Sequence, residues 1–434
     1  MKQSEFKRRR SQLMKMMGKG TIAILSSASQ VTRNRDVDFP FRQDSDFLYL
    51  TGFNEPDAVM VLIPGRKHGE YILFCREKDP EQETWHGRRA GQEGAVEEHG
   101  ADDSFPIEDM DDILPGLLEG TDAIFNIMGR YPEFDQRLIG WVNHIKEQSR
   151  AGLHVPSEFV SLDYILHDMR LFKSREELKL MRKAAAISVR AHERAMRLCR
   201  PGHYEYQIAA EFDHEFRQYG AQHAYPAIVG GGANGCILHY TENSDELNDG
   251  DLLLIDSGCE VQGYASDITR TFPVNGKYSP AQRDIYNIVL AAQAAAIKKV
   301  RPGNHWNDPH NAAVRVITKG LTEIKLLKGH PTKLIKEQAY RKFYMHRTGH
   351  WLGLDVHDVG DYKVGDQWRL LEPGMVLTIE PGIYIPAHSK GVHRKWWDIG
   401  IRIEDDVLVT NTDCEVLTEA LPKKPGDIEA LMAG

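Results

Sequence analysis

Two stretches of the sequence share the pattern G-x-x-L-x-I-[D/E]-x-G: G-D-L-L-L-I-D-S-G at residues 250–258 and G-M-V-L-T-I-E-P-G at residues 374–382. A short apolar run followed by a turn signal is typical of a buried strand. Each run ends at an acid, Asp256 in the first stretch and Glu380 in the second. The repeat predicts a duplicated α/β unit whose halves meet about a pseudo-twofold axis, each presenting one carboxylate to a shared central site.

Helical patterns repeat in the same way. One helical pattern runs through Met196 to R-P-G at 200–202, another runs through Val300 to R-P-G at 301–303, and each is followed by a further helical pattern. The helix starts are also marked in the sequence. Ser174 and Glu177 form a capping box, and Ser279 is an N-cap followed by Pro280 and Gln282. Paired helices upstream of each strand support the duplication.

The chain has 434 residues, a length that favours two domains. Its first part mixes a helical pattern at 4–17 with strand patterns at 21–25, 58–63, 71–75 and 123–127. The pattern changes around residues 171–174, which predicts a smaller N-terminal α/β domain at 1–172 and a second domain at 173–434. The fold class is therefore α/β (α+β). Within the first helix, Lys7, Arg8, Arg9 and Arg10 are expected to form a solvated face.

Charge and cysteine content exclude several classes of protein. The 54 basic and 63 acidic residues give a net charge of -9, which does not favour nucleic acid or anionic lipid as a partner. No apolar run approaches the roughly 18 residues of a membrane span, and no signal-peptide pattern is present. Five scattered cysteines without a C-x-x-C motif favour a reducing compartment. We therefore expect a cytoplasmic protein.

Further acids follow the two strand motifs. Asp267 lies eleven residues after Asp256, in a strand-like stretch at 264–269 that a short hairpin would bring beside the first strand. Alternation at 401–404 places Arg402 and Glu404 on one face. A buried carboxylate costs several kcal/mol unless a cation or strong donors compensate it. Several acids at strand ends therefore predict a functional site.

Histidines are concentrated in the same half of the chain. His346, His350 and His357 lie within twelve positions, among glycines that allow close approach of the backbone. This density favours a site over simple packing. His239 follows a glycine-rich turn at 230–235, but the turn lacks G-x-x-x-x-G-K-[S/T] and so indicates a nucleotide site only weakly.

Ordered motifs across the chain resemble one known family, the Xaa-Pro aminopeptidases (aminopeptidase P). In the second domain they are H-Y-T-E-N at 239–243, L-I-D-S-G-C-E at 254–260, D-I-T-R-T-F-P-V at 267–274, H-W-L-G-L-D-V-H-D-V-G at 350–360, L-E-P-G-M-V-L-T-I-E-P-G at 371–382 and G-I-R-I-E-D-D at 400–406. In the first domain, F-R-Q-D-S-D-F-L-Y-L-T-G-F-N-E-P at 41–56 and W-H-G-R-R-A-G-Q at 85–92 resemble the bacterial members. The resemblance implies a catalytic domain of the pita-bread fold.

The resemblance also implies two divalent metal ions, usually manganese in bacterial members. The implied ligands are Asp256, Asp267, His350, Glu380 and Glu404. Four carboxylates balance the charge of two divalent ions, and oxygen-dominated coordination with one imidazole favours Mn²⁺ or Mg²⁺ over a thiolate-type zinc site. None of the five cysteines fits as a ligand.

Roles for the neighbouring residues follow from the same resemblance. Glu380 doubles as the general base, while His239 and His357 hold the substrate and stabilise the tetrahedral intermediate. Arg402, on the strand face of Glu404, is expected to fix the carboxylates by charge-assisted hydrogen bonds.

The pocket for the proline ring is assigned to His346 and Tyr384, and Asp36 and Trp85 are expected to approach the site from the first domain. The first domain is expected to serve oligomerisation and substrate access, since similar bacterial enzymes form tetramers. A homotetramer or a dimer is therefore expected. The basic, tryptophan-containing stretch 386–397 is expected at the rim of the site.

Three functions are compatible with these residues. The favoured one is an aminopeptidase that hydrolyses Xaa-Pro-Yaa peptides after the first residue, by attack of a hydroxide held between the two metals. A prolidase shares the fold and ligands but takes only Xaa-Pro dipeptides. The third is a non-catalytic peptide-binding module of the same fold. Such modules lose metal ligands, whereas all five positions are filled here.

Overall fold

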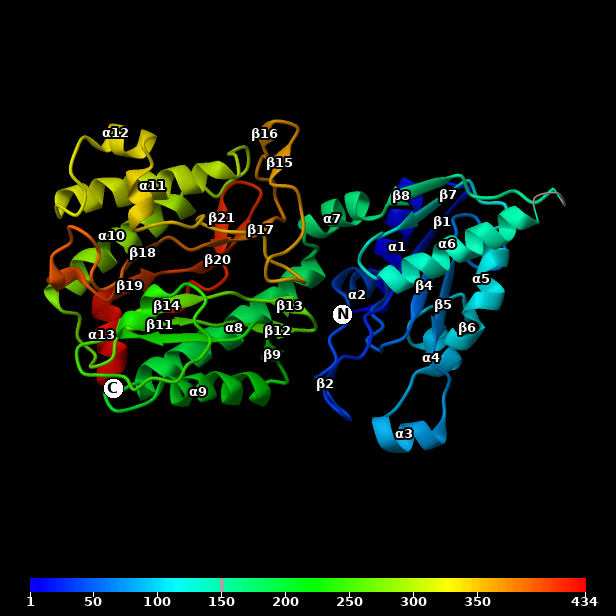
Figure 1. Ribbon diagram of the computed structural model, residues 1–434, viewed down its shortest axis with the longest axis horizontal. Coiled ribbons are helices and arrows are strands. Elements are labelled where there is room, and N and C mark those ends of the chain that lie inside the picture. The colour runs from blue at the N-terminus through cyan, green and yellow to red at the C-terminus, as the bar shows by residue number, and fades with distance from the viewer. Residues whose placement is uncertain (149–151) are drawn as a thin grey trace. The chain divides into compact units, whose positions relative to one another are not determined.

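The computed structural model describes residues 1–148 and 152–434. The chain forms two compact units, Met1–Met169 and Arg170–Gly434, which are described separately below (Figure 1). Residues 172–173, at the predicted domain boundary, lie between helices α7 (Asp163–Leu171) and α8 (Arg175–Leu198). Within the described ranges, no helix combines the length and the apolar character that crossing a bilayer requires.

A mixed sheet forms the centre of the N-terminal unit, in the order β6-β5-β4-β1-β7-β8. β1 runs antiparallel to β4 and parallel to β7, and the four strands predicted in this part of the sequence all belong to the sheet. The strands are β1 (Thr21–Ser26), β4 (Val59–Leu62), β5 (Tyr71–Cys75), β6 (Asp103–Pro106), β7 (Ala123–Asn126) and β8 (Glu158–Ser161).

Helices cover this sheet because its strands β1, β4, β5 and β7 are buried along their length. Ile22 and Ile24 pack with Leu114 of α5 and with Leu138 and Trp141 of α6 in one core. The other elements of the unit are α1 (Gln3–Met17), β2 (Thr32–Asn34), β3 (Val37–Asp38), α2 (Ser45–Thr51), α3 (Pro80–His86), α4 (Gly91–Glu97), η1 (Ile107–Asp109), α5 (Met110–Leu118) and α6 (Pro132–Glu147).

The prediction that Lys7, Arg8, Arg9 and Arg10 form a solvated face of the first helix is wrong for two of these four residues. Arg9 and Arg10 are buried, because they share the helix face of Phe6 and Leu13. Each guanidinium donates to a carbonyl near the end of α2, at 2.9 Å in both cases. Arg9 also lies 4.1 Å from the ring centroid of Tyr49. Carbonyl acceptors and an aromatic face compensate the buried charge locally.

The C-terminal unit repeats one arrangement twice. In the first half, α8 packs on α9 beside the sheet β10-β11-β14, and in the second, α10 packs on α11 beside the sheet β17-β20-β21. Figure 1 shows the two helix pairs on opposite sides of the strands. The elements are α9 (Glu205–Gln218), β10 (Ile228–Gly231), β11 (Leu252–Asp256), β14 (Thr269–Pro273), α10 (Pro280–Ile297), α11 (Asn307–Glu323), β17 (Val376–Ile379), β20 (Asp405–Val409) and β21 (Cys414–Val416).

The two R-P-G turns, at 200–202 and 301–303, make equivalent backbone hydrogen bonds in the two halves. Gly202 and Gly303 both adopt positive φ, 88° and 83°, which favours glycine. The Gly202 amide donates to Leu247 at 2.9 Å, and the Gly303 amide donates to Leu371 at 3.1 Å. Both acceptors lie three residues before the glycine that opens each strand motif. The predicted duplication is therefore visible in local hydrogen bonding.

Both predicted capping boxes are present, at Ser174 with Glu177 and at Ser279 with Gln282, and they fix where α8 and α10 begin. This unit has further helices and strands outside the two helix pairs and their sheets. They are β9 (Gln222–His223), η3 (Gly232–Cys236), β12 (Cys259–Val261), β13 (Tyr264–Ala265), α12 (Pro331–Lys336), η4 (Ala339–Lys342), β15 (Lys363–Val364), β16 (Gln367–Trp368), β18 (Gly382–Ile385), η5 (Arg394–Trp396), β19 (Ile399–Arg402) and α13 (Pro425–Ala433).

Candidate metal centre

Strand pairing in the first half brings two acids together. β11 runs antiparallel to β14, with Asp256 opposite Thr269. The strand predicted over 264–269 is interrupted, because β13 ends at Ala265 and β14 begins only at Thr269. Asp267 lies in the gap and turns toward the end of β11. Gly258 makes this approach possible, since a Cβ there would lie 1.9 Å from the carbonyl oxygen of Ser266.

The second half supplies the other three predicted ligands. β17 and β20 are antiparallel with Ile379 opposite Asp405, so Glu380 and Glu404 follow and precede paired strands at the same edge. His350 is fixed by its backbone, whose amide donates to Thr378 Oγ1 at 3.1 Å. A Cβ at Gly349 would lie 1.9 Å from the Thr378 carbonyl oxygen. The histidine therefore follows a glycine for steric reasons.

The side chains of the predicted ligands from both halves point toward one another. His350 Nε2 lies 3.3 Å from Asp267 Oδ2 and 3.8 Å from Glu380 Oε1. Ligand atoms of Asp267, His350 and Glu404 all lie within 4.8 Å of one another. His350 Nδ1 lies 2.9 Å from the Trp351 carbonyl oxygen. Because that carbonyl can only accept, Nδ1 carries a hydrogen, and Nε2 is the nitrogen directed at the carboxylates.

Arg402 links the two halves of the cluster. It donates to Asp256 Oδ2 at 2.7 Å and to Thr269 Oγ1 at 3.0 Å. The Thr269 hydroxyl in turn donates to Glu404 Oε2 at 2.6 Å. These charge-assisted bonds orient carboxylates that would otherwise repel one another. Arg402 and Glu404 therefore meet on the same threonine.

Tyr225 is a member of the cluster that the sequence did not reveal. Its hydroxyl lies 2.7 Å from Asp256 Oδ1 and 2.5 Å from Asp267 Oδ1. The only local signal is its place before β10, whose first residue, Ile228, pairs with Asp256. A tyrosine followed by proline is too common to identify a site, so only the folded sheet shows its role.

The carboxyl groups of this cluster are buried close to one another, which favours their protonated forms. Burial raises the pKa of Glu380 to about 7, and the nearby Asp267 carboxylate acts in the same direction. Burial and the charge of Asp267 likewise raise the pKa of Glu404 well above its usual range. Burial opposes protonation of His350, but Asp267 outweighs it and raises the imidazole pKa to about 9. The cluster retains protons that divalent cations could replace.

The donor set of the cluster fits divalent metal ions. Asp256, Asp267, Glu380 and Glu404 offer carboxylate oxygens and His350 one imidazole nitrogen, a donor set that suits Mn²⁺ or Mg²⁺. All five cysteines are free thiols, and none is among the described residues that line the cavity. A thiolate-type site is not formed here.

A cavity of about 1270 Å³ opens above the cluster. His239, His346 and His357 line it together with Asp256, Asp267, His350, Glu380, Arg402 and Glu404. The ring of His357 lies 4.2 Å from that of His350, between centroids. The predicted ligands and the three other predicted histidines therefore share one chamber.

Other predicted site residues lie outside the described lining of the cavity. Tyr384 is fully buried and stands behind the wall, where its hydroxyl lies 2.9 Å from His346 Nε2 and accepts from Arg402 at 3.0 Å. Asp36 lies in the turn between β2 and β3 of the N-terminal unit, and Trp85 lies in α3 with 77% of its surface exposed. The stretch 386–397 also contributes no residue to the described lining.

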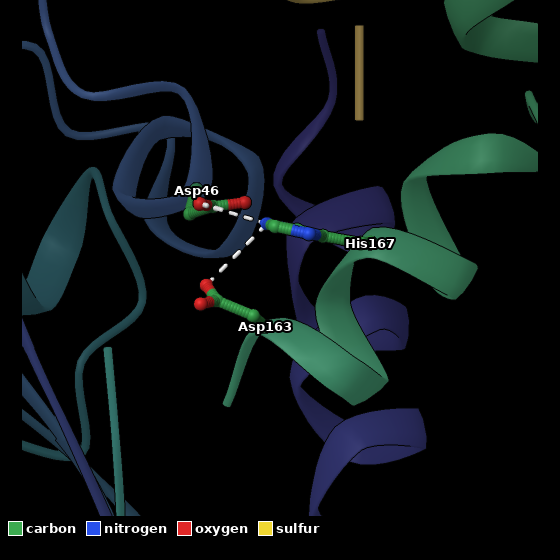
Figure 2. Close-up of side chains that lie close together, drawn as sticks. All are labelled: Asp46, Asp163 and His167. Carbon is green, nitrogen blue, oxygen red and sulfur yellow. Dashed lines mark ion pairs between the residues drawn. The ribbon is translucent and has the colours of Figure 1, made fainter. Parts of the chain in front are cut away.

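A second cluster with similar side chains lies in the N-terminal unit (Figure 2). His167 Nε2 points between two carboxylates, 3.4 Å from Asp163 Oδ1 and 3.8 Å from Asp46 Oδ2. Asp46 Oδ2 also accepts from Arg130 at 2.8 Å, and the same guanidinium reaches Asp44 at 2.8 Å. A cation of the protein itself therefore already occupies one side of this cluster.

Comparisons with known proteins agree with the fold. Residues 179–411 match metallopeptidase family M24, and residues 6–125 match the N-terminal domain of aminopeptidase P. The chain thus belongs to the class that joins these two domains, and it is a member of metallopeptidase family M24. The expected mixed α/β fold, with a pita-bread domain after a smaller N-terminal domain, is confirmed.

The similarity extends over whole chains. The Xaa-Pro aminopeptidase of Escherichia coli (strain K12) is 47% identical over 430 residues, which cover 99% of this chain and 97% of that protein. The structure of Pseudomonas aeruginosa aminopeptidase PepP superposes with a TM-score of 0.99 at 58% identity, covering 100% of this chain and 98% of that one. Proline aminopeptidase P II from Yersinia pestis gives 0.97 at 49% identity, with both chains fully covered.

Proposed function

We propose that this protein is a dinuclear-metal aminopeptidase that removes the first residue of peptides with proline in second position. The observation that carries the proposal is the buried convergence of four carboxylates and one imidazole beneath a chamber lined by three further histidines. The names of the full-length relatives support the substrate class. A non-catalytic module of this fold would not need to retain the complete set of ligands.

The residues that would hold two divalent ions, which we propose to be Mn²⁺, are Asp256, Asp267, His350, Glu380 and Glu404. Two such ions supply a nucleophilic water at neutral pH and Lewis-acid polarisation of the scissile carbonyl. Arg402 and Tyr225 hold the carboxylates in the orientation that this requires.

Glu380 is suited to move the proton. Its carboxylate lines the cavity, with Oε1 3.8 Å from His350 Nε2, and a carboxyl group at that place can take up a proton and release it again. The bond before proline is a tertiary amide whose nitrogen carries no hydrogen, so the leaving proline nitrogen must be protonated. We propose that Glu380 receives the proton of the attacking water and delivers it to that nitrogen.

The chamber histidines bind the rest of the substrate in this proposal. His239 and His357 stabilise the tetrahedral intermediate, and His346 contacts the proline ring. Tyr384 acts from behind the wall, since its hydroxyl joins His346 to Arg402. Asp36 and Trp85 are proposed to contact substrate from the domain at 1–172, which would also carry oligomerisation contacts of a tetramer or dimer. We place the protein in the cytoplasm, in keeping with its free cysteines.

Three peptides test the activity. Purified protein with Mn²⁺ should release free Xaa from Xaa-Pro-Yaa, act weakly or not at all on Xaa-Ala-Yaa, and leave N-acetylated Xaa-Pro-Yaa intact. Equal rates on the proline and alanine peptides would refute proline specificity, and turnover of the acetylated peptide would refute the exopeptidase assignment. A dipeptide Xaa-Pro distinguishes a prolidase, which would cleave it in preference to the tripeptide.

A further inference from the structure

Four charged side chains form a cluster that ties the segment carrying His357 to the start of the C-terminal unit. Arg170 Nη2 lies 2.6 Å from Asp358 Oδ1 and 2.7 Å from Asp355 Oδ2, and Lys173 Nζ lies 2.9 Å from Asp358 Oδ2. The side chains of Arg170, Lys173 and Asp358 are only 2%, 1% and 1% exposed. Two cations thus contact two carboxylates, and only the Asp355 side chain, 37% exposed, reaches solvent.

The segment 353–360 has little regular structure to hold it. Its backbone bonds include Asp358 N–H to Trp351 at 2.9 Å, and Ala265 N–H to Gly353 at 2.8 Å. The Asp355 amide also donates to the Asp358 carboxylate at 3.4 Å. A Cβ at Gly353 would lie 2.1 Å from Asp358 Oδ2. The backbone of the turn therefore packs around the Asp358 carboxylate, which contacts both Gly353 and the Asp355 amide.

His357 depends on that turn for its position. Its side chain faces the cavity, and no side-chain hydrogen bond of His357 is found among the described residues. Its ring contact is with His350, at 4.2 Å between centroids. The next residue along the chain, Asp358, is instead held by two charge-assisted bonds. The position of the imidazole is thus set through the backbone from its neighbour.

Burial of these charges is difficult to explain by stability alone. Removing ions from water is costly, and an apolar group of similar size often stabilises a core equally well. Burial would raise the pKa of Asp358, but Lys173 and Arg170 outweigh it and lower the pKa, so the carboxylate stays ionised. A charged cluster provides directional bonds that an apolar one lacks.

We propose that Arg170, Lys173 and Asp358 are positioning residues that hold His357 at the cavity. The proposal rests on the proposed function for the role of His357, and extends it to three buried residues that contact neither the cavity nor the predicted ligands. Asp355 joins the cluster to the cavity wall. The cluster therefore acts on catalysis only through the 353–360 turn.

Coupling between variants tests this proposal. Asp358→Asn and Lys173→Met, with metal loaded, should lower kcat by about 10- to 100-fold, the loss expected from a misplacement near 1 Å, while KM changes far less. In a His357→Ala background the same substitutions should have less than about a twofold effect, because the positioned group is absent. Equal losses in both backgrounds would overturn the proposal. Lys173→Arg, which keeps the charge, should restore most of the activity.

A readout independent of activity separates this proposal from the proposed function. Hydrogen exchange of the 351–360 peptide should be faster in Lys173→Met than in wild type, while exchange in α11 should not change. The matched control is Arg182→Met, which breaks an ion pair with Glu415 of 2.7 Å on the surface and should leave both exchange and kcat unchanged. Unaltered exchange in Lys173→Met would overturn the positioning role, even if no Xaa-Pro peptide were cleaved.

Discussion

The two clusters of histidine and acidic side chains in this protein look alike but differ in charge balance. In the C-terminal unit, Asp267, His350 and Glu404 bring their ligand atoms within 4.8 Å, and so do Asp46, Asp163 and His167 in the N-terminal unit. The first group belongs to a buried set of four carboxylates that Arg402 and His350 compensate only in part. In the second, Asp163 is 37% and His167 29% exposed, while the one fully buried carboxylate, Asp46, is paired with Arg130.

Proximity of donor atoms therefore does not by itself define a metal site. In the N-terminal cluster Arg130 already pairs with the buried Asp46 carboxylate, so a bound ion would add little compensation there. A buried group of carboxylates must obtain compensation from cations or protons. The raised pKa values of Glu380 and Glu404 are consistent with a shortage of positive charge in the buried C-terminal cluster.

The largest effect is expected when a predicted metal ligand of the C-terminal cluster is removed. Asp267→Ala or Glu404→Ala should lower activity by at least about a thousandfold, because each loss removes a ligand and its share of several kcal/mol of charge stabilisation. Elemental analysis should find fewer than two metal ions per chain in these variants. Chelation of the wild type should have the same effect, and Mn²⁺ should reverse it. A variant that kept full activity would exclude the dinuclear assignment.

His357→Ala should lower the catalytic rate without removing the metal ions. We expect kcat to fall by about 10² to 10³-fold, the typical contribution of one donor to a developing oxyanion, with a smaller change in KM. The metal content should stay at the wild-type level, since the ring contacts His350 but His357 is not a predicted ligand. Loss of metal in this variant would require His357 to be reassigned as a ligand.

Stability of the metal-free protein should depend on pH through the catalytic cluster. The pKa of Glu380 is raised to about 7 and that of His350 to about 9, so both groups favour the protonated form in the folded state. Their contribution is present below the unfolded values and is lost as pH rises through the folded ones.

We therefore expect the Tm of chelated protein to fall by an amount on the order of 5 °C between about pH 5 and pH 9, relative to protein with Mn²⁺. Thermal melts of both forms across this range provide the measurement. A constant difference between the two forms would contradict the charge-surplus explanation.

The smallest effect concerns the N-terminal cluster. His167→Ala should cost on the order of 1 kcal/mol of unfolding free energy, because Asp163 is partly exposed and the buried Asp46 keeps its ion pair with Arg130, and it should change neither kcat nor metal content. Denaturant unfolding and elemental analysis check both points. A metal ion bound by the wild type and lost from this variant would show that the two clusters are alike after all.

Several parts of this molecule could be predicted from sequence because their signals are local. The paired G-x-x-L-x-I-[D/E]-x-G motifs, the R-P-G turns and the capping boxes each lie within a few residues, where hydrogen bonding and side-chain alternation decide structure. They predicted the duplicated unit and the strand ends at which Asp256 and Glu380 lie. The resemblance to a known family then supplied the complete set of predicted ligands.

Only the tertiary structure decided the contacts between distant segments. Tyr225 joins Asp256 and Asp267 across separations of 31 and 42 residues, and Lys173 meets Asp358 across 185. The burial of Arg9 and Arg10 likewise depended on carbonyls 40 residues away. The sequence determined which side chains were available and which short elements they form. The environment that makes a tyrosine, a lysine or an arginine part of a site exists only once the chain has folded, because burial and charge compensation are properties of packing.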